Sequence, residues 1–529
     1  MGDASRRCTW IVVAALGFGV LASGSIAQAG DEVTIVDQWN DSACNTGADV
    51  WGEGDYAYWG HFGGNCLDIL DVSVPSDVQW VGSFSAPPPD QSNSLQDVRV
   101  HNGLAYLGYG GDNNNGAAIV DVRDPGNAVQ LTTLRVTAGN VIYSDVHNLF
   151  YHEGYLYLAD SRTNTFAVVD LSDYDPDNNP PAQINEAKWH MTNVGSQIVH
   201  DFTALKDRLY VSAWDEIIVY DISNIANEPP VFLGSAPGQS SHANWATDDE
   251  RFIVTAEERS GGGIKLYEVT EVGDGGGVDI TLLDEVVDPG AFSAHNPIIV
   301  CNRVYTSWYE SGLLVHEIDA DAGQLVEVGR VDPGTIWGVY PLLGLDRVIL
   351  GGFGGFYIAD ATLDSVPCDD ETVILPEDFI VVRGLLVSGN LEDLWNSDDS
   401  YVIVRPAAFA PQPGPPVQVE VIGTSVNQTP AVLRFKQETH MEPETLPDIE
   451  YEILFFNYDT QEYDLVDFRT RPGGLDDKVT VVEITDNPGR YIDDKTGQVD
   501  ALMTFKAVSF SDARLAVAHI DQATWSFVP

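Results

Sequence analysis

Basic residues are scarce in this chain. It has 26 lysines and arginines against 80 aspartates and glutamates, a formal net charge of -54 at pH 7. Proteins that bind nucleic acids neutralise phosphates with basic patches, so this imbalance excludes nucleic acid as a partner. Anionic lipid surfaces are disfavoured for the same reason, and the surplus of acid is itself an ordinary means of staying soluble in salty surroundings.

Long hydrophobic segments are also absent once the first 29 residues are set aside as a signal peptide. Arg6 and Arg7 precede an apolar run over 10–21, and residues 27–29 (AQA) form a cleavage pattern. A membrane anchor is the alternative, but the run is shorter than the roughly 20 residues of a spanning helix. We predict cleavage before Gly30 and a mature protein without a membrane span, secreted to the extracellular space or held at the cell surface.

Cysteine is rare too. Four cysteines remain after the signal peptide, and none belongs to a Cys-x-x-Cys pair, which argues against a thiolate metal site or a redox pair. An even number in an exported chain predicts two disulfides. Proximity favours Cys44 with Cys66, which leaves Cys301 with Cys368.

Common enzyme signatures are missing. The chain has no Gly-x-Ser-x-Gly elbow, no His-Glu-x-x-His and no phosphate loop. Any chemistry must therefore come from residues that the fold brings together.

What the sequence does contain is a repeat. Seven apolar segments each end in an acid, and successive acids are about 43 to 51 residues apart, the length of a four-stranded propeller blade. A second apolar strand, opened by a turn residue, lies upstream of each. We therefore predict an all-β protein with a seven-bladed β-propeller over residues 30–368. The acids are Asp71, Asp121, Asp170, Asp221, Glu268, Glu317 and Asp360.

One further strand predicts closure of the ring. The seventh repeat stops near Asp360 without a fourth strand, while residues 33–39 (VTIVDQW) form a strand before the first repeat. Pairing the two would remove the exposed edges of an open array. A linear β-solenoid is the alternative, and it would not need the extra strand.

The repeats also carry a family resemblance. The strings GAAIVDVRDP (116–125) and FAVVDLSD (166–173), with repeats that open in His-Asn or His-Asp, resemble the LVIVD-repeat family and its secreted choice-of-anchor B members. The resemblance covers roughly residues 33–362. It implies a β-propeller at the cell surface or outside the cell, without a settled biochemical activity. Later repeats depart from the pattern, since Glu268 replaces the aspartate.

Residues 369–529 show a different β pattern. About eight alternating strands lie between turns rich in glycine, proline and aspartate, with a proline-rich loop at 406–416. Such a pattern predicts a β-sandwich of jelly-roll type. We interpret it as an accessory domain for packing or attachment.

One constellation points to chemistry. In blades three to six the innermost strand opens with a histidine, whereas blades one, two and seven place Ala48, Gln96 and Trp337 there. Innermost strands run beside the channel of a propeller, so these imidazoles should crowd one side of a ring about the axis. The histidines are His147, His200, His242 and His295.

Two interpretations of these histidines stay open. Neutral imidazole is a ligand for copper, iron and zinc, so four of them converging would suit a transition metal at the propeller axis. This arrangement is similar in geometry, though not in motif, to the four-histidine iron site of carotenoid-cleaving oxygenases and to the selenium-binding protein family. Alternatively, a repeated histidine is part of the LVIVD pattern and hydrogen-bonds the next blade.

Other residues are candidates for the channel mouth. Glu257, with Glu258 and Arg259 beside it, is a candidate partner that orients the histidines. Gln96 is a candidate ligand contact at the same level. Four tryptophans are expected either to stack a sugar or other flat ligand or to wedge between blades. They are Trp214, Trp245, Trp308 and Trp337.

Calcium is a further candidate cofactor. The loops 111–115 (GDNNN) and 175–179 (DPDNN) offer the oxygen ligands that hard cations prefer, but neither has EF-hand spacing.

Two functions follow from these observations. The first is a non-enzymatic extracellular propeller that binds a protein or glycan ligand at one face. The second is a metal-dependent oxidoreductase that uses the four histidines. The direction of the imidazoles, into the channel or sideways into turns, discriminates between them.

Overall fold

The computed structural model describes residues 33–528 apart from several gaps. These gaps are 45, 86–93, 111–115, 179, 273–275, 343–346, 362–371, 396–399, 408–416, 426–429, 431, 444–448, 472, 475–477, 485–486, 494 and 508–515. The predicted signal peptide, Cys368 and the loop 111–115 lie outside the described residues.

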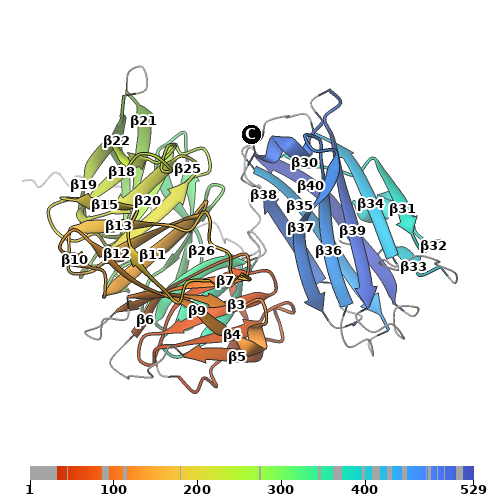
Figure 1. Ribbon diagram of the computed structural model, residues 1–529, viewed down its shortest axis with the longest axis horizontal. Helices are drawn as coiled ribbons and strands as arrows, with labels where there is room; N and C mark the ends of the chain where they lie inside the picture. The colour runs from red at the N-terminus through yellow and green to blue at the C-terminus, as the bar shows by residue number, and fades with distance from the viewer. Residues whose placement is uncertain are drawn as a thin grey trace, which may run out of the picture.

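The described chain is built from β-sheets that are antiparallel except where β14 (Gln183–Glu186) pairs with β9 (Val129–Ala138), which confirms the all-β prediction (Figure 1). Its helical segments are short 3₁₀ turns, namely η1 (Pro125–Asn127), η2 (Leu391–Leu394) and η3 (Pro488–Tyr491). The predicted disulfide between Cys44 and Cys66 is present. Within the described ranges, no helix is long and apolar enough to cross a membrane.

Residues 33–361 form successive four-stranded antiparallel units. The first three contain β2 (Gly47–Glu53), β3 (Tyr56–His61), β4 (Cys66–Asp71) and β5 (Gln79–Ser85); β6 (Ser94–His101), β7 (Leu104–Gly110), β8 (Ala117–Asp121) and β9 (Val129–Ala138); and β11 (Val146–His152), β12 (Tyr155–Asp160), β13 (Thr165–Asp170) and β15 (Trp189–Thr192). Two short strands, β10 (Val141–Ile142) and β14 (Gln183–Glu186), pair with β9.

The fourth and fifth units share one long strand. They contain β16 (Asp201–Leu205), β17 (Arg208–Ser212), β18 (Trp214–Asp221) and β19 (Val231–Ala246), followed by β20 (Phe252–Glu257), β21 (Ile264–Glu271) and β22 (Val278–Val286). The sixth contains β23 (Pro297–Val300), β24 (Arg303–Ser307), β25 (Leu313–Asp319) and β26 (Gln324–Val331). The seventh in the described chain contains β27 (Ile336–Leu342), β28 (Arg347–Gly352) and β29 (Phe356–Asp360), with β1 (Thr34–Trp39) as its outer strand.

The N-terminal strand β1 thus completes the last unit of this series. It pairs antiparallel with β29, with Thr34 opposite Asp360 and Trp39 opposite Phe356. Residues from both ends of the series therefore share one sheet, as the extra strand at 33–39 predicted.

Hydrophobic clusters lie between neighbouring units. One joins Ile69 of the first unit to Leu107 of the second, and another joins Trp59 of the first unit to Ile349 and Phe356 of the last. Each sheet is covered on both faces, so the side chains of its middle strands are buried on both sides and are mostly apolar. In β7, for example, every residue is buried. The first strands contact one another in the order β2, β6, β11, β16, β19, β23 and β27, and β27 contacts β2.

The structure explains the repeated acids. Asp71, Asp170 and Asp221 each accept a hydrogen bond at Oδ1 from the backbone N–H two residues later, at 2.8–3.0 Å. Such a cap fixes the turn after the third strand. Where glutamate replaces aspartate, it pairs across the sheet instead, as Glu317 does with Arg303 at 3.2 Å.

Residues 372–528 form a second body of two antiparallel sheets, called here the C-terminal sheets (Figure 1). Side chains from both sheets fill one core cluster that includes Phe435, Trp525 and Phe505. The first sheet contains β30 (Thr372–Ile374), β32 (Leu385–Ser388), β33 (Val402–Arg405), β35 (Val432–Glu442), β38 (Lys478–Ile484) and β40 (Val517–Val528). The second contains β31 (Asp378–Arg383), β34 (Val417–Thr424), β36 (Ile449–Asn457), β37 (Glu462–Arg471) and β39 (Gln498–Ala507).

The two bodies touch through a buried ion pair. Asp55, in the turn between β2 and β3, accepts hydrogen bonds from Arg469 and Arg471 of β37. Lys478 Nζ donates to Ser73 Oγ at 3.0 Å beside it. Burial opposes ionisation of Asp55, but the two guanidinium groups lower its pKa overall. The contact therefore lies just after the C-terminal end of β2, whereas Ala48 is near the N-terminal end of this strand.

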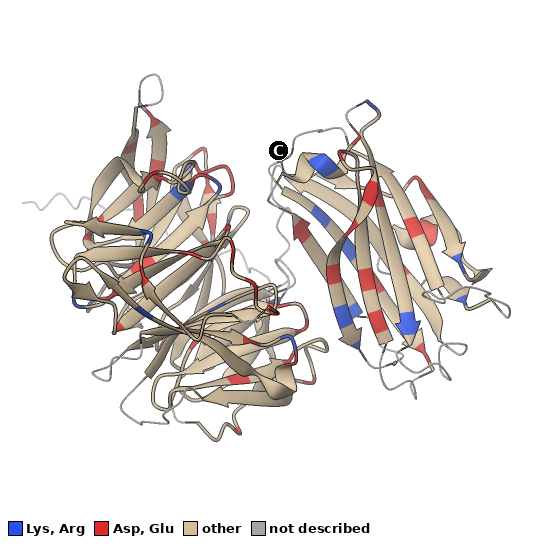
Figure 2. Cartoon of the chain, in the orientation of Figure 1, with Lys and Arg blue, Asp and Glu red and all other residues tan. Residues whose placement is uncertain are grey.

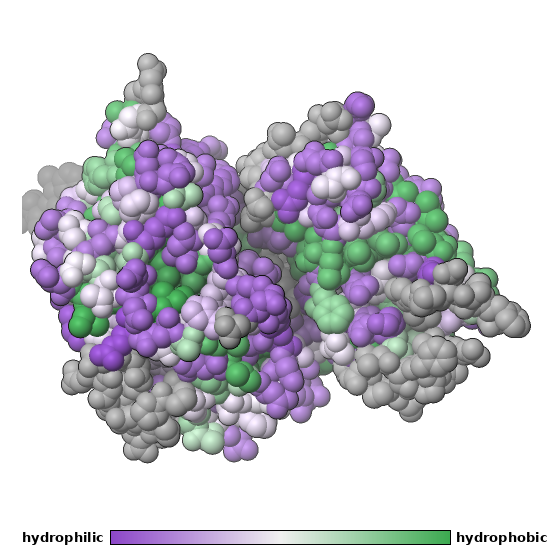
Figure 3. Space-filling view, in the orientation of Figure 1, coloured by the Kyte–Doolittle hydropathy of each residue, from purple (hydrophilic) through white to green (hydrophobic). Residues whose placement is uncertain are grey.

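Acidic residues are spread along the strands and turns of both bodies (Figure 2). Hydrophobic side chains also gather on the visible face of the C-terminal sheets (Figure 3). Exposed apolar residues of the C-terminal sheets include Ile380, Val382, Leu465 and Phe468. The C-terminal sheets thus present more apolar surface than a purely solubilising domain would need.

Candidate metal centre

The four predicted histidines come together in the structure. His147 lies on β11 and His242 on β19, while His200 and His295 lie just before β16 and β23. Consecutive imidazole centroids are 4.5, 4.0 and 4.1 Å apart. We call this set the histidine arc. Ligand nitrogens of His147, His200 and His242 all lie within 4.8 Å of one another.

Three of the four imidazoles, those of His200, His242 and His295, each form a hydrogen bond from Nδ1 to the backbone of the next unit. His200 Nδ1 donates to the carbonyl oxygen of His242 at 3.0 Å, and His242 Nδ1 donates to that of His295 at 3.2 Å. His295 Nδ1 donates to the carbonyl oxygen of Trp337 at 2.7 Å. A carbonyl only accepts, so the proton resides on Nδ1 and the lone pair on Nε2. This is the tautomer that a metal-binding histidine needs.

The imidazoles are neutral at physiological pH. Burial lowers the pKa of His147 to about 4, and it lowers the pKa of His200 and His242 well below the usual value. The pKa of His295 is lowered by burial as well. Repulsion between neighbouring imidazoles adds to the effect on His200 and His242. Neutral rings present lone pairs instead of competing protons.

One carboxylate faces the arc. Glu258 Oε2 lies 3.6 Å from His242 Nε2, and ligand atoms of His242, Glu258 and His295 form a second close group. The Tyr309 hydroxyl donates to Glu258 Oε1 at 2.5 Å. Burial raises the pKa of Tyr309, and the negative charge of Glu258 raises it further. Tyr309 therefore stays protonated and holds the carboxylate in place.

Glu257 lies elsewhere. It is buried and pairs with Lys265 at 2.5 Å and with Arg259 at 2.7 Å. Successive residues of a strand point to opposite faces, and Glu257 is the last residue of β20. The side chain of Glu257 therefore lies on the face that carries Lys265 and Arg259, while the side chain of Glu258 points to the other face, toward the arc. Of the two neighbouring acids, Glu258 is thus the one that lies beside His242, while Glu257 contacts Lys265 and Arg259.

The tryptophans divide into three environments. Trp337 and Trp214 lie beside the arc, with ring centroids 4.5 Å from His295 and 5.5 Å from His200. Trp245 lies on β19, three residues after His242, and its ring centroid is 6.5 Å from that of Trp51. Trp308 is fully buried in the cluster between the fifth and sixth units, so it wedges between sheets and does not line a mouth.

Aromatic side chains form a rim around Trp337. Its ring is 5.3 Å from Phe62 and 5.5 Å from Phe353, and these two phenylalanines are 41 % and 38 % exposed. Gln96, at the equivalent position of the second unit, donates from Nε2 to Ser94 Oγ at 2.7 Å. The rim gives the arc an apolar side from which a ligand could approach.

A polar plug lies one residue beyond the arc. Arg99 Nη1 donates to Asp49 Oδ2 at 2.8 Å and also to Asp97, and both acids are buried. Only a cavity of about 10 Å³ remains beside them, barely enough for one water. Burial raises the pKa of Asp201 to about 7 against the opposing effect of Arg99. The described side chains thus fill the space between the first strands at this level.

Sequence reasoning missed this plug, although a signal was present. Asp49, Asp97 and Asp201 each follow the histidine-level position of their repeat by one residue. Lining up that second register would have placed three acids in one ring.

The second calcium candidate uses its carboxylates within the protein. Asp175 accepts hydrogen bonds from the backbone of Asp177 and Asn178, and Asp177 pairs with Arg123 at 2.9 Å. The described part of this loop is therefore already satisfied by protein donors.

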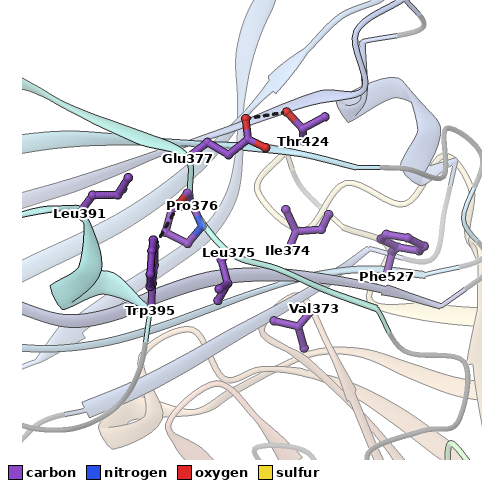
Figure 4. Close-up of a pocket in the computed structure, with 9 residues that line it drawn as sticks. All are labelled: Val373, Ile374, Leu375, Pro376, Glu377, Leu391, Trp395, Thr424 and Phe527. Carbon is purple, nitrogen blue, oxygen red and sulfur yellow. Dashed lines mark hydrogen bonds between the residues drawn. The ribbon is translucent and has the colours of Figure 1, made fainter.

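The C-terminal sheets contain a separate cavity of about 530 Å³ (Figure 4). Trp395 and Phe527 are among its walls, and Trp395 Nε1 donates to the carbonyl oxygen of Pro376 at 3.1 Å. Glu377 is its one acid and accepts from Thr424 Oγ1 at 3.1 Å. Its lining offers apolar contact and no set of convergent reactive groups.

Comparison with known proteins links the chain to one repeat. Residues 46–86 and 145–174 match the LVIVD repeat, and these stretches cover the first unit and most of the third. The LVIVD prediction is thereby supported at two places. No curated protein matches the chain.

Proposed function

We propose that this protein is an exported seven-bladed β-propeller whose histidine arc binds one transition-metal ion and serves as the centre of an extracellular ligand-binding site. The pairing of β1 with β29 supports closure of the ring. So does the hydrophobic cluster between the first and last units. Residues 30–368 form the propeller in this proposal, and residues 369–529 form a β-sandwich accessory domain.

The anchoring of the imidazoles carries the proposal. Nδ1 of His200, His242 and His295 donates to the next unit, so each ring is held in one orientation with Nε2 unprotonated. The structural and metal-binding interpretations of the repeated histidine are therefore compatible. The same bond that ties one blade to the next also prepares a ligand nitrogen.

The donor set selects the class of metal. Neutral nitrogen ligands suit copper, iron or zinc better than calcium or magnesium. His147, His200 and His242 are the ligands in this proposal, and His295 and Glu258 lie next to His242 as further donors. Glu258 would offset part of the charge of the ion.

The rim and the plug define how a ligand reaches this centre. Arg99 and its acids fill the channel on one side of the arc, whereas Phe62 and Phe353 are exposed on the other. A flat or apolar group, such as a sugar face or an aromatic side chain of a partner protein, would stack on this rim. The bound metal would then contact a polar group of the same ligand.

A second candidate function is a metal-dependent oxidoreductase. The contact between Tyr309, Glu258 and His242 favours it, because a carboxylate beside a metal position is suited to accept a proton. Bound metal would supply the electron transfer, while Glu258 would hold the proton at Oε2.

Export is part of the proposal as well. The Cys44–Cys66 disulfide supports it, because such bonds persist in oxidising compartments.

Elemental analysis of the purified protein tests the metal centre. We expect the unchanged protein to hold about one equivalent of copper, iron or zinc per chain more than the variant in which His200 and His242 are both replaced by alanine. His101→Ala is the matched control, since His101 is exposed and stacks on Tyr151 away from the arc. A metal content that is the same in the double variant, the control and the unchanged protein would overturn the proposal.

A further inference from the structure

A second cluster of imidazoles lies in the C-terminal sheets. His440 of β35 and His519 of β40 are opposite one another in the register of the two strands. Their rings are stacked, with centroids 4.3 Å apart and planes inclined by 18°. Their separation in the sequence hides this proximity, which only the pairing of β35 with β40 creates.

A carboxylate completes the group. Glu442 lies two residues after His440 on β35, so both side chains are on the same face of the strand. Glu442 Oε2 is 3.6 Å from His519 Nε2. One ligand atom from each of His440, Glu442 and His519 lies within 4.8 Å of the other two.

This face is the outer side of the sheet. Met441 and Ala518, which alternate with these residues, are buried in the core between the two sheets. Tyr401 packs edge-on against both imidazoles, with centroids 5.1 Å from His440 and 5.6 Å from His519. His440 is only 6 % exposed, while the Glu442 side chain is 43 % exposed. The group is therefore walled on one side and open to solvent at its acid.

From this geometry we propose that His440, His519 and Glu442 form a second metal site, which binds a divalent transition cation of the zinc type. Two imidazole nitrogens and one carboxylate oxygen are a common three-ligand set for zinc, which leaves a fourth position for water or a ligand.

The site is independent of the histidine arc. It is built entirely from the C-terminal sheets, and none of its residues belongs to the repeat units. Exposure of Glu442 lets its carboxylate move the short distance needed to close on an ion. The chain would then hold two metal ions, one in each body.

Zinc titration of the full-length protein, followed by equilibrium dialysis, tests this site. The background is the variant with His200→Ala and His242→Ala, in which the arc is disabled. We expect this background to bind about one equivalent of Zn²⁺ and to lose it, or to bind it at least tenfold more weakly, when His519→Ala or Glu442→Gln is added.

Two comparisons keep the result unambiguous. Glu442→Gln changes an exposed side chain, so a loss of binding in that variant does not reflect a loss of folding. Glu438→Gln is the matched control, because Glu438 is another half-buried acid on β35 that contributes no ligand atom to this group. Unchanged zinc affinity in both His519→Ala and Glu442→Gln would overturn the second site, whatever the metal content of the arc.

Discussion

Asp55 accepts hydrogen bonds from Arg471, which lies 416 residues later in the chain, and both side chains are buried. A charge pair removed from water is costly to break from one side, because the remaining charge has no solvent to compensate it. This contact therefore ties the C-terminal sheets to the first repeat unit.

Replacing Asp55 with asparagine tests the tie. We expect a loss of about 3–5 kcal/mol at the contact, because Arg471 would remain buried without a counter-charge and Arg469 would keep only Asp467. Differential scanning calorimetry should show separate unfolding transitions for the two bodies where the unchanged protein shows coupled ones. Glu327→Gln removes a solvent-exposed pair with Arg330 and should cost less than about 1 kcal/mol. Equal effects of the two substitutions would contradict the assignment.

Trp59 tests the junction between the first and last units. It is 2 % exposed in the cluster that joins them, so Trp59→Ala should lower the free energy of unfolding by about 3–5 kcal/mol. Phe232→Ala removes an aromatic ring that is 57 % exposed and should change it far less. Urea unfolding followed by circular dichroism gives both values. A small effect at Trp59 would mean that the two ends of the series are not tightly joined.

Glu258→Gln tests the carboxylate beside the arc. The amide keeps the shape of the side chain but removes its charge, so we expect the metal affinity of the arc to fall by about 10- to 100-fold without loss of fold. Competition with a chromophoric chelator measures this change. Glu186→Gln alters an exposed acid on β14 and serves as control. Unaltered affinity in Glu258→Gln would place that residue outside the centre.

Acid should destabilise the metal-free arc. The pKa of His147 is about 4 in the folded chain and near 6.5 when unfolded, so the unfolded chain binds more protons between these values. Stability from this group is present above pH 6.5 and is lost as the pH falls toward 4, by about 1–3 kcal/mol. Asp201, with its pKa raised to about 7, contributes in the opposite direction.

Comparison with His147→Gln separates these contributions. Urea unfolding at several pH values should show a weaker acid loss in the variant, because glutamine cannot take up the proton. Asp201 is unchanged in both proteins and cancels in the difference. Parallel stability curves would contradict a lowered pKa of His147 in the folded chain.

Much of the arrangement could be predicted from the sequence because one repeated signal reports it. Aspartates at the ends of several third strands cap turns and mark the repeat. Counting back from the second strand of each repeat then places His147, His200, His242 and His295 at one position. Position within a repeat is a local property, so spacing suffices to predict it.

Side-chain direction and long-range pairing could not be predicted in the same way. Glu257 and Glu258 are the same residue type at adjacent positions, so the sequence does not show which side chain faces the arc. The alternation of side chains at the end of β20 decides this. His440 and His519 become neighbours only through the register between β35 and β40, for which the sequence offers no repeat. Trp308 was ambiguous because a large aromatic ring suits a core as well as a surface.

The pairing of β1 with β29 has a consequence for biosynthesis. The ribosome makes Thr34 long before Asp360, and at common elongation rates the delay is on the order of tens of seconds. During that interval the first strand has no partner, so the last sheet cannot mature while the chain is being made. A nascent chain that ends before Phe356 would therefore leave the strand at its start unpaired, and the outer edge of the last sheet is formed only after the other units have been synthesised.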